Sequence, residues 1–316
     1  MSSDKTIAVF GATGAQGGGL ARAILADPAG GFRVRAITRR AGSAPAQALA
    51  AAGAEVVIAD LDDEASVARA LEGVHGAYCV TNFWEHFSPE REKAQAAAMA
   101  RGAKAAGVRH AIWSTLEDSR RFVPLEDDRM PTLMGRYKVP HFDAKAESDR
   151  SFVDAGVPTT FLLTSFYWEN LIHFGLGPKP AGDGIFVWAV PLGAARFPSI
   201  AVEDIGRCAY GIFRSGASLA GRRIGIAGDV LTGEEMAAAM SDALGRTVRY
   251  QALAPAQFRG AGFPGAEDLG NMFQFNVDFA DAFCGARDVA AARALDPQLQ
   301  SFRQWLAANA ARIPLS

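Results

Sequence analysis

Three glycines at positions 11, 14 and 17 lie in the segment GATGAQG, which follows a short apolar run and precedes an alanine-rich one. In a strand-turn-helix context, such glycines permit a tight turn and let a bound group approach the backbone closely. The start of the helix then offers unpaired N–H groups and a positive dipole end to a pyrophosphate. The alternative is a glycine-rich turn that binds nothing. The sequence predicts a dinucleotide-binding loop made of Gly11, Thr13, Gly14, Ala15, Gln16 and Gly17.

Basic residues stand where the ribose of a dinucleotide's adenosine half is usually recognised. NAD-binding proteins typically place an acidic residue about 20 positions after the glycine loop, where it binds the ribose 2′-OH. Thr38, Arg39 and Arg40 instead offer a hydroxyl and two guanidiniums, and arginine matches phosphate oxygens with its planar fork. This favours NADP(H) over NAD(H); the alternative is a solvated arginine pair in an arginine-rich chain. Asp60 either contacts the adenine edge or belongs with Asp62 and Asp63 to a group that caps the next helix.

The elements that position these residues follow from an alternation that runs from Lys5 to about Leu163. Short β-branched runs alternate with alanine-rich amphipathic stretches, which predicts parallel βαβ units and a doubly wound α/β (Rossmann) sheet. Ligands of such sheets lie beyond the carboxyl ends of the strands. The expected strands are 6–11, 32–38, 54–60, 76–81, 110–115 and 159–164, and the expected helices begin near residues 15, 44, 63, 89 and 139.

The alternation stops after Leu163, which indicates a second, smaller and mainly helical region. We expect a Rossmann domain over residues 1–164, to which the chain returns near 200–228, and a C-terminal domain over residues 165–316. Helices are expected at 202–215, 232–244, 265–283 and 299–310.

Composition excludes several classes of protein. The 316 residues include 32 Lys+Arg and 34 Asp+Glu, so the formal net charge is −2 and direct DNA binding is not expected, because coating phosphates requires a basic face. The three cysteines and the five histidines lack the spacing of disulfide frameworks or metal sites, so we expect no metal and a reducing, cytoplasmic compartment. No long uncharged apolar run and no secretory signal occur, so no membrane span is expected.

Several motifs together resemble the NmrA-like family of atypical short-chain dehydrogenases, especially its animal NADPH-sensor branch. Besides FGATGAQGG they are ITRR, VTNFWE, HFDAKAE, FYWENL and GFPGAEDLGNMFQF, and the resemblance runs from Thr6 to about Leu306. The glycine loop is shared by many relatives, whereas the last four motifs in that order are far more specific. The resemblance implies NADP(H) as the cofactor and adds contacts from Thr81, Asn82, Lys145, Phe166, Tyr167 and Asn170. For the aromatic residues among these, core packing is the alternative.

Dehydrogenases of the wider superfamily use a serine together with Tyr-x-x-x-Lys on one helix, where four residues make about one turn. The lysine ammonium lowers the pKa of the phenol, which then exchanges a proton with the substrate. None of the five tyrosines here has a lysine four positions later. At the matching place stand His141 and Lys145, with Ser114 at the end of the expected strand 110–115. The lysine retains the donors that ribose hydroxyls need, whereas a neutral imidazole beside a lysine is a poor acid. The alternative is an exposed helix pair.

Two functions of different classes follow. The first is a redox-sensing regulator that binds NADPH and NADP⁺ and changes loop order or association, read by a regulatory protein partner or by a homodimer. The long connection 117–139 is its candidate mobile element. The second is an NADPH-dependent reductase of quinones or activated carbonyls that uses His141 and Lys145, since quinone reduction can take protons from water. Whether the chain is an enzyme stays open here; the altered proton donor favours the regulator.

Overall fold

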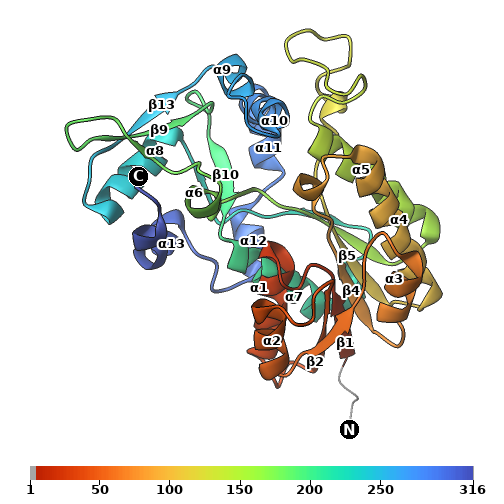
Figure 1. Cartoon of the computed structure of the whole chain (residues 1–316). Helices are drawn as coiled ribbons and strands as arrows, with labels where there is room; N and C mark the ends of the chain where they lie inside the picture. Colours follow the sequence, from red (N-terminus) through yellow and green to blue (C-terminus); the bar gives the residue numbers. More distant parts are fainter. Residues whose placement is uncertain (1–4, 316) are drawn as a thin grey trace. The chain divides into compact units, whose positions relative to one another are not determined.

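The structure is a computed structural model that describes residues 5–315, and it is drawn in Figure 1. The chain divides into two units. Unit 1 runs up to Asp118 and also contains Ala144–Leu163 and Val202–Ile224. Unit 2 contains Ser119–Asp143, Thr164–Ala201 and the chain from Gly225 onward.

Unit 1 is built on a seven-stranded sheet in the order β11-β6-β5-β4-β1-β2-β3. The pairs among the first six strands of the chain are parallel, so the predicted doubly wound Rossmann fold is confirmed. Chain order reverses on either side of β1, which makes its carboxyl end the expected place for a ligand. The strands are β1 (Lys5–Val9), β2 (Phe32–Thr38), β3 (Glu55–Ile58), β4 (Gly76–Cys79), β5 (His110–Thr115), β6 (Thr159–Leu163) and β11 (Arg223–Gly225).

Helices cover both faces of this sheet (Figure 1). One face carries α1 (Ala15–Leu25), α2 (Ala44–Ala51) and α7 (Val202–Ser215), and the other carries α3 (Glu64–Ala70), α4 (Pro89–Ala105) and α5 (Pro140–Ala155). Under the second set lies an apolar cluster of sheet and helix side chains that includes Phe10, Cys79, Met99, Trp113 and Phe152. The expected strands each form within two residues of their predicted ends, and the five helices begin within one residue of the predicted starts.

Unit 2 is mainly helical, as the sequence predicts, but it also contains short strands that the sequence analysis did not predict. They form two three-stranded sheets, ordered β12-β10-β7 and β13-β9-β8. The strands are β7 (Phe166–Tyr167), β8 (Lys179–Pro180), β9 (Phe186–Val190), β10 (Phe197–Ile200), β12 (Asp229–Leu231) and β13 (Val248–Ala252). The helices are α6 (Asn170–His173), α8 (Gly233–Leu244), α9 (Pro255–Arg259), α10 (Ala266–Asp278), α11 (Ala280–Gly285), α12 (Val289–Leu295) and α13 (Phe302–Asn309).

The part of the long connection that belongs to unit 2, residues 119–139, is hydrogen-bonded along its length. The buried ammonium of Lys138 donates to the carbonyl groups of Asp127 and Met130. From α10, the Asn271 amide donates to the Lys138 carbonyl. The connection is therefore a folded segment. Among residues 5–315, no helix combines the length and the apolar character needed to cross a membrane.

Candidate functional site

The glycine loop joins β1 to α1 where the sequence places it. Gly11 has a φ of +63°, in the left-handed region that favours glycine, and its carbonyl accepts a hydrogen bond from the Gly14 N–H at 2.8 Å. A Cβ on Gly17 would come within 2.6 Å of the Gly11 and Phe10 carbonyl oxygens. The first helical turn and the end of β1 therefore approach as closely as a glycine at 17 allows. Gly14 occupies the N-cap without a side chain, so the first N–H groups of α1 have no side-chain cap there.

Other residues of the loop differ in accessibility. Thr13 and Ala15 are exposed, as a ligand contact requires. The Gln16 side chain accepts a hydrogen bond from the Tyr78 hydroxyl on β4, so its amide is tied to the sheet. Tyr78, which the sequence analysis passed over, thus positions the start of α1.

Arg39, at the end of β2, is paired with a carboxylate. Its Nη1 donates to Glu85 Oε1, and this hydrogen bond is the main reason that the pKa of Arg39 is raised. Glu85 ends a short 3₁₀ turn, η1 (Phe83–Glu85), that follows β4. The backbone N–H of the neighbouring Arg40 donates to Thr38 Oγ1 at 3.2 Å. All three predicted residues lie at this strand end, but the sequence analysis missed Glu85, which is 46 positions away from Arg39.

Asp60 lies exposed at the end of β3, and helix capping falls to a neighbour. Asp63 accepts from the N–H groups of Ala65 and Ser66 and is the N-cap of α3. Asp60 Oδ1 instead accepts from the Asp62 N–H at 3.0 Å. Of the two predicted roles, capping belongs to Asp63, and a contact with adenine stays a prediction for Asp60.

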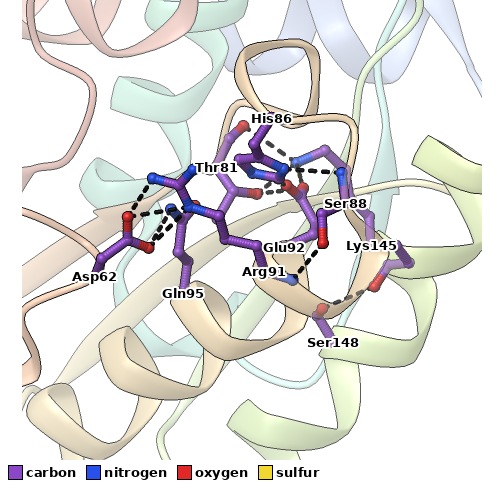
Figure 2. A network of polar contacts seen from close by, with 10 residues as sticks. Asp62, Thr81, His86, Ser88, Arg91, Glu92, Gln95, Lys145 and Ser148 are labelled. Carbon is purple, nitrogen blue, oxygen red and sulfur yellow. Dashed lines mark hydrogen bonds and ion pairs between the residues drawn. The ribbon is translucent and has the colours of Figure 1, made fainter. Parts of the chain in front are cut away.

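Lys145 lies in a buried polar cluster, shown in Figure 2. Its Nζ is 2.7 Å from Glu92 Oε1 on α4, 2.8 Å from Thr81 Oγ1 and 3.3 Å from the Thr81 carbonyl oxygen. The Thr81 hydroxyl in turn donates to Glu92. An ammonium has three N–H donors, and these contacts account for them. Glu92 has no exposed surface and Lys145 is only 8% exposed, so the alternative of an exposed helix pair is wrong for Lys145.

His86 belongs to the same cluster and lies next to the second carboxylate oxygen of Glu92 (Figure 2). Its Nδ1 accepts from the Ser88 N–H, which assigns the proton of the neutral ring to Nε2. That Nε2 is 3.6 Å from Glu92 Oε2, and neither atom has a hydrogen-bond partner within residues 5–315. Burial lowers the pKa of His86, which favours the neutral ring. The charge of Glu92 is therefore balanced mainly by Lys145.

Ser114 does not join this cluster. On β5, the side chains of Trp113 and Thr115 both donate to Asp149 of α5, at 3.0 and 2.6 Å. The Lys145 ammonium lies 5.2 Å from the centre of the Trp113 ring. Successive side chains of a strand point to opposite faces, so Ser114 points away from the face that α5 covers. The geometry gives no support to a catalytic pairing of Ser114 with Lys145.

His141, in unit 2, has a carboxylate partner of its own. Its Nδ1 lies 2.6 Å from Asp268 Oδ1, and its backbone N–H donates to Asp268 Oδ2 at 3.1 Å. The residue is 6% exposed, so the alternative of an exposed pair is wrong here too. Asp268 fixes the ring orientation. It lies 127 positions from His141, within the GAEDLGN part of a motif quoted above, and the sequence analysis did not assign it a role.

The remaining predicted contacts are distributed between the units. In unit 1, Asn82 is exposed and is the N-cap of η1. In unit 2, the Phe166 ring packs against Phe197 and Phe273 with centroids 5.3 and 6.2 Å apart, which favours core packing for this residue. Tyr167 pairs with β10 and Asn170 begins α6, both partly exposed. No group of three or more potential metal ligands occurs among residues 5–315.

Comparisons with known proteins agree with this architecture. The NmrA-like family matches residues 3–305. A relative, the NmrA-like family domain-containing oxidoreductase himF of Aspergillus japonicus, is 30% identical in an alignment 285 residues long that covers 85% of this chain and 82% of the relative. The solved structure of NmrA, a negative transcriptional regulator in complex with NADP, is 25% identical with a TM-score of 0.77, covering 96% of this chain and 95% of NmrA. NmrA has also been solved with NAD.

An NADPH-dependent quinone oxidoreductase of Escherichia coli is similar as well, at 25% identity and a TM-score of 0.66, covering 96% of this chain and 98% of that protein. The fold is therefore one that holds a nicotinamide dinucleotide, and it occurs in both regulators and reductases. The match over nearly the whole length shows that the chain belongs to the NmrA-like family.

Proposed function

We propose that the chain binds NADP(H) at the carboxyl edge of the seven-stranded sheet and acts as a redox-sensing regulator. Support for binding comes from the glycine loop. A side chain at position 17 would collide with the backbone of Phe10 and Gly11, so the loop and the helix can approach closely only with glycine there. The first N–H groups of α1 have no side-chain cap, as the binding of a pyrophosphate requires. Arg39 and Arg40 supply cations for a 2′-phosphate at the end of β2. Thr81 and Asn82, which follow β4, and Lys145, which lies on α5, are the candidates for contacts with the nicotinamide ribose.

The ion pair between Lys145 and Glu92 is the observation that favours a regulator over an enzyme. In a Tyr-x-x-x-Lys dehydrogenase, the lysine cation acts on a phenol. Here no tyrosine occupies the matching position, and the ammonium is neutralised by a completely buried Glu92. Both parts of that proton-transfer pair are thus altered. In this proposal the chain binds a dinucleotide but lacks the tyrosine that usually donates the proton in this superfamily.

Calorimetric titration of the full chain with NADPH, NADP⁺ and NADH tests the proposal. A sensor requires different affinities for NADPH and NADP⁺, because a ligand shifts a population only through differential binding. The Arg39→Ala, Arg40→Ala double variant should lose NADPH affinity by at least about tenfold, since it removes two charge-assisted contacts. Arg101→Ala with Arg150→Ala, which breaks two exposed ion pairs elsewhere, is the matched control. Equal affinities for NADPH and NADP⁺ would contradict a sensor.

The output of the sensor is a change in association with a regulatory protein or with a second copy of the chain. Light scattering with saturating NADPH and then NADP⁺ measures self-association directly. If the mass is the same with NADPH and with NADP⁺, a change in self-association is excluded, and a regulatory protein that binds the chain in one of the two states remains the proposed partner.

A second candidate function is an NADPH-dependent reductase of quinones or activated carbonyls. The hydrogen-bonded pair of His141 and Asp268 favours it, because a carboxylate that orients an imidazole is a common feature of acid–base sites. Bound NADPH would supply a hydride. Turnover above about 1 s⁻¹ with any quinone, aldehyde or enone, lost in Lys145→Ala, would replace the regulator by the reductase.

A further inference from the structure

The contact between Arg39 and Glu85 brings a carboxylate to a place where the sequence shows none. The sequence around the end of β2 contains arginines and no acidic residue, which is the basis for expecting NADP(H). The fold adds Glu85 from η1, after β4. Strands β2 and β4 flank β1 on its two sides, so the pair connects the two strand ends on either side of the glycine loop.

The charges at this edge are balanced. Asp60 and Arg91 both act electrostatically on Arg39, with opposite signs, and Arg91 is hydrogen-bonded to Asp62, as Figure 2 shows. Interactions therefore link two arginines and three carboxylates here, and with the adjacent Arg40 the formal charges of these six residues sum to zero: Arg39, Arg40, Arg91, Asp60, Asp62 and Glu85. A 2′-phosphate at the end of β2 can pair with the Arg39 guanidinium only by competing with the Glu85 carboxylate, which already accepts a hydrogen bond from it.

We propose that Glu85 sets the choice between NADPH and NADH, a proposal that rests on the dinucleotide binding proposed above. With NADPH, the 2′-phosphate takes the Arg39 guanidinium and the displaced Glu85 carboxylate opposes it through like-charge repulsion. With NADH, Glu85 remains beside Arg39 and is the acceptor for the ribose 2′-OH, the role that an acidic residue at the end of β2 plays in NAD-binding proteins. One arginine–glutamate pair thus accommodates both cofactors and limits discrimination between them.

Both side chains can rearrange at small cost. Those of Arg39 and Glu85 are 51% and 40% exposed, and exposed ion pairs hold their partners weakly. The exchange of Glu85 for a phosphate therefore disturbs no buried group. It also means that a substitution at 85 leaves the folded core intact, so binding measurements on the variants are interpretable.

The experiment compares NADPH and NADH affinities for the full chain and for Glu85→Gln and Glu85→Ala, by calorimetry at low and at high salt. We expect Glu85→Gln to bind NADPH about five- to tenfold more tightly, because a neighbouring negative charge is removed, with the gain reduced at high salt. Glu85→Ala, which also removes the acceptor, should in addition bind NADH more weakly. Glu90→Gln, an exposed glutamate on α4, is the matched control and should leave the ratio unchanged.

Two failures are distinguishable. If the wild-type chain binds both cofactors but the NADPH-to-NADH affinity ratio of Glu85→Gln stays within about twofold of the wild-type ratio, the role of Glu85 is overturned while dinucleotide binding stands. If neither cofactor binds the wild-type chain or any variant, the proposed function and this inference both fail. Arg39→Ala combined with Glu85→Gln removes both the guanidinium and the carboxylate that competes for it, so this double variant should bind NADPH more weakly than Glu85→Gln and no more tightly than the wild type; a double variant that binds NADPH as tightly as Glu85→Gln also overturns the proposal.

Discussion

Lys145 and Glu92 form an ion pair at 2.7 Å in which the carboxylate has no exposed surface. Water screens such a pair little, so each charge is balanced mainly by the other. Taking both charges out of water is costly, and the hydrogen bonds from Lys145 to Thr81 and from Thr81 to Glu92 offset part of that cost. The ammonium is thereby held at a defined position with little net field around it. A cation so compensated is poorly suited to lowering the pKa of a neighbouring acid.

A double-mutant cycle tests this pairing. Glu92→Gln and Lys145→Met should each lower the free energy of unfolding by about 3–5 kcal/mol, because each leaves one buried charge without its partner. The double variant should be less destabilised than the sum, with a coupling of about 1–3 kcal/mol measured by urea unfolding. The same cycle on the exposed Arg150–Asp154 pair should give less than about 0.5 kcal/mol. Additive effects at positions 92 and 145 would show that the pair is not coupled.

Gly17→Ala should harm both folding and cofactor binding. The added Cβ would meet two backbone carbonyl oxygens at 2.6 Å, and backbone cannot move aside as a flexible side chain can. We expect a loss of about 1–3 kcal/mol in the free energy of unfolding, together with weaker NADPH binding as the helix shifts away from the loop.

Gly18→Ala is the control for that variant. A Cβ at 18 would lie 3.1 Å from the end of the Arg22 side chain and 3.3 Å from the Ala12 carbonyl oxygen, so the backbone contact is 0.7 Å longer than at Gly17; alanine is also the better helix former by about 1 kcal/mol. Its stability should equal or exceed that of the wild type. If Gly17→Ala and Gly18→Ala have the same free energy of unfolding and the same NADPH affinity, the close backbone approach at Gly17 does not determine either quantity.

The sequence predicted the parts of the fold that depend on local pattern. Glycine spacing located the turn before α1, and the alternation of β-branched and alanine-rich runs located the strands and helices of the parallel sheet. No strand of unit 2 was predicted. Strands β7, β8 and β12 have only two or three residues, too few for a periodicity to develop, and the longer ones lie outside the alternation of β-branched and alanine-rich runs that located strands of the same length in unit 1. An aromatic residue such as Phe166 looks the same in a core as at a site, and only its contacts with Phe197 and Phe273 distinguish the two.

The charges that the sequence analysis missed are all partners supplied from far along the chain. Glu85 reaches Arg39 across 46 positions, and Asp268 reaches His141 across 127. Glu92 is one of several charged residues on α4, and its position in the sequence does not distinguish it from the exposed ones. Spacing within a helix or strand predicts neighbours one turn or two residues apart, whereas these pairs exist only because the fold brings separate segments together. A buried carboxylate has to be paired, which is the physical reason that Glu92 and Asp268 have such partners.

Asp268 should matter for stability as well as for the orientation of His141. Asp268→Ala leaves the buried Nδ1–H and the backbone N–H of His141 without an acceptor, at a cost of about 2–4 kcal/mol in thermal or chemical unfolding. Asp268→Asn keeps one acceptor oxygen and should lose less. Glu267→Ala removes the adjacent, exposed carboxylate from the same helix turn and should change stability by less than about 1 kcal/mol. Similar losses at 267 and 268 would argue against the pairing with His141.

His110 should make the protein sensitive to mild acid. The ring is buried at the start of β5, where Nε2 is 2.8 Å from Thr160 Oγ1, and burial lowers its pKa to about 4. An unfolded histidine has a pKa of about 6.5, so between these values the unfolded chain takes up a proton that the folded chain does not. The free energy of unfolding therefore falls as the pH drops from about 6.5 to about 4, by up to about 3 kcal/mol from this residue.

His110→Gln removes that proton uptake while an amide can still bind Thr160, so the difference between its unfolding free energy and that of the wild type should shrink or reverse as the pH falls. Taking the difference cancels the titration of groups that do not interact with His110; His75, whose charge also lowers the pKa of His110, is coupled to it. His173→Gln, at an exposed position, should retain the wild-type pH dependence. Urea unfolding at half-unit steps from pH 7 to pH 4 measures all three proteins, and parallel curves for the wild type and His110→Gln would show that the buried ring takes up its proton as readily as an unfolded one.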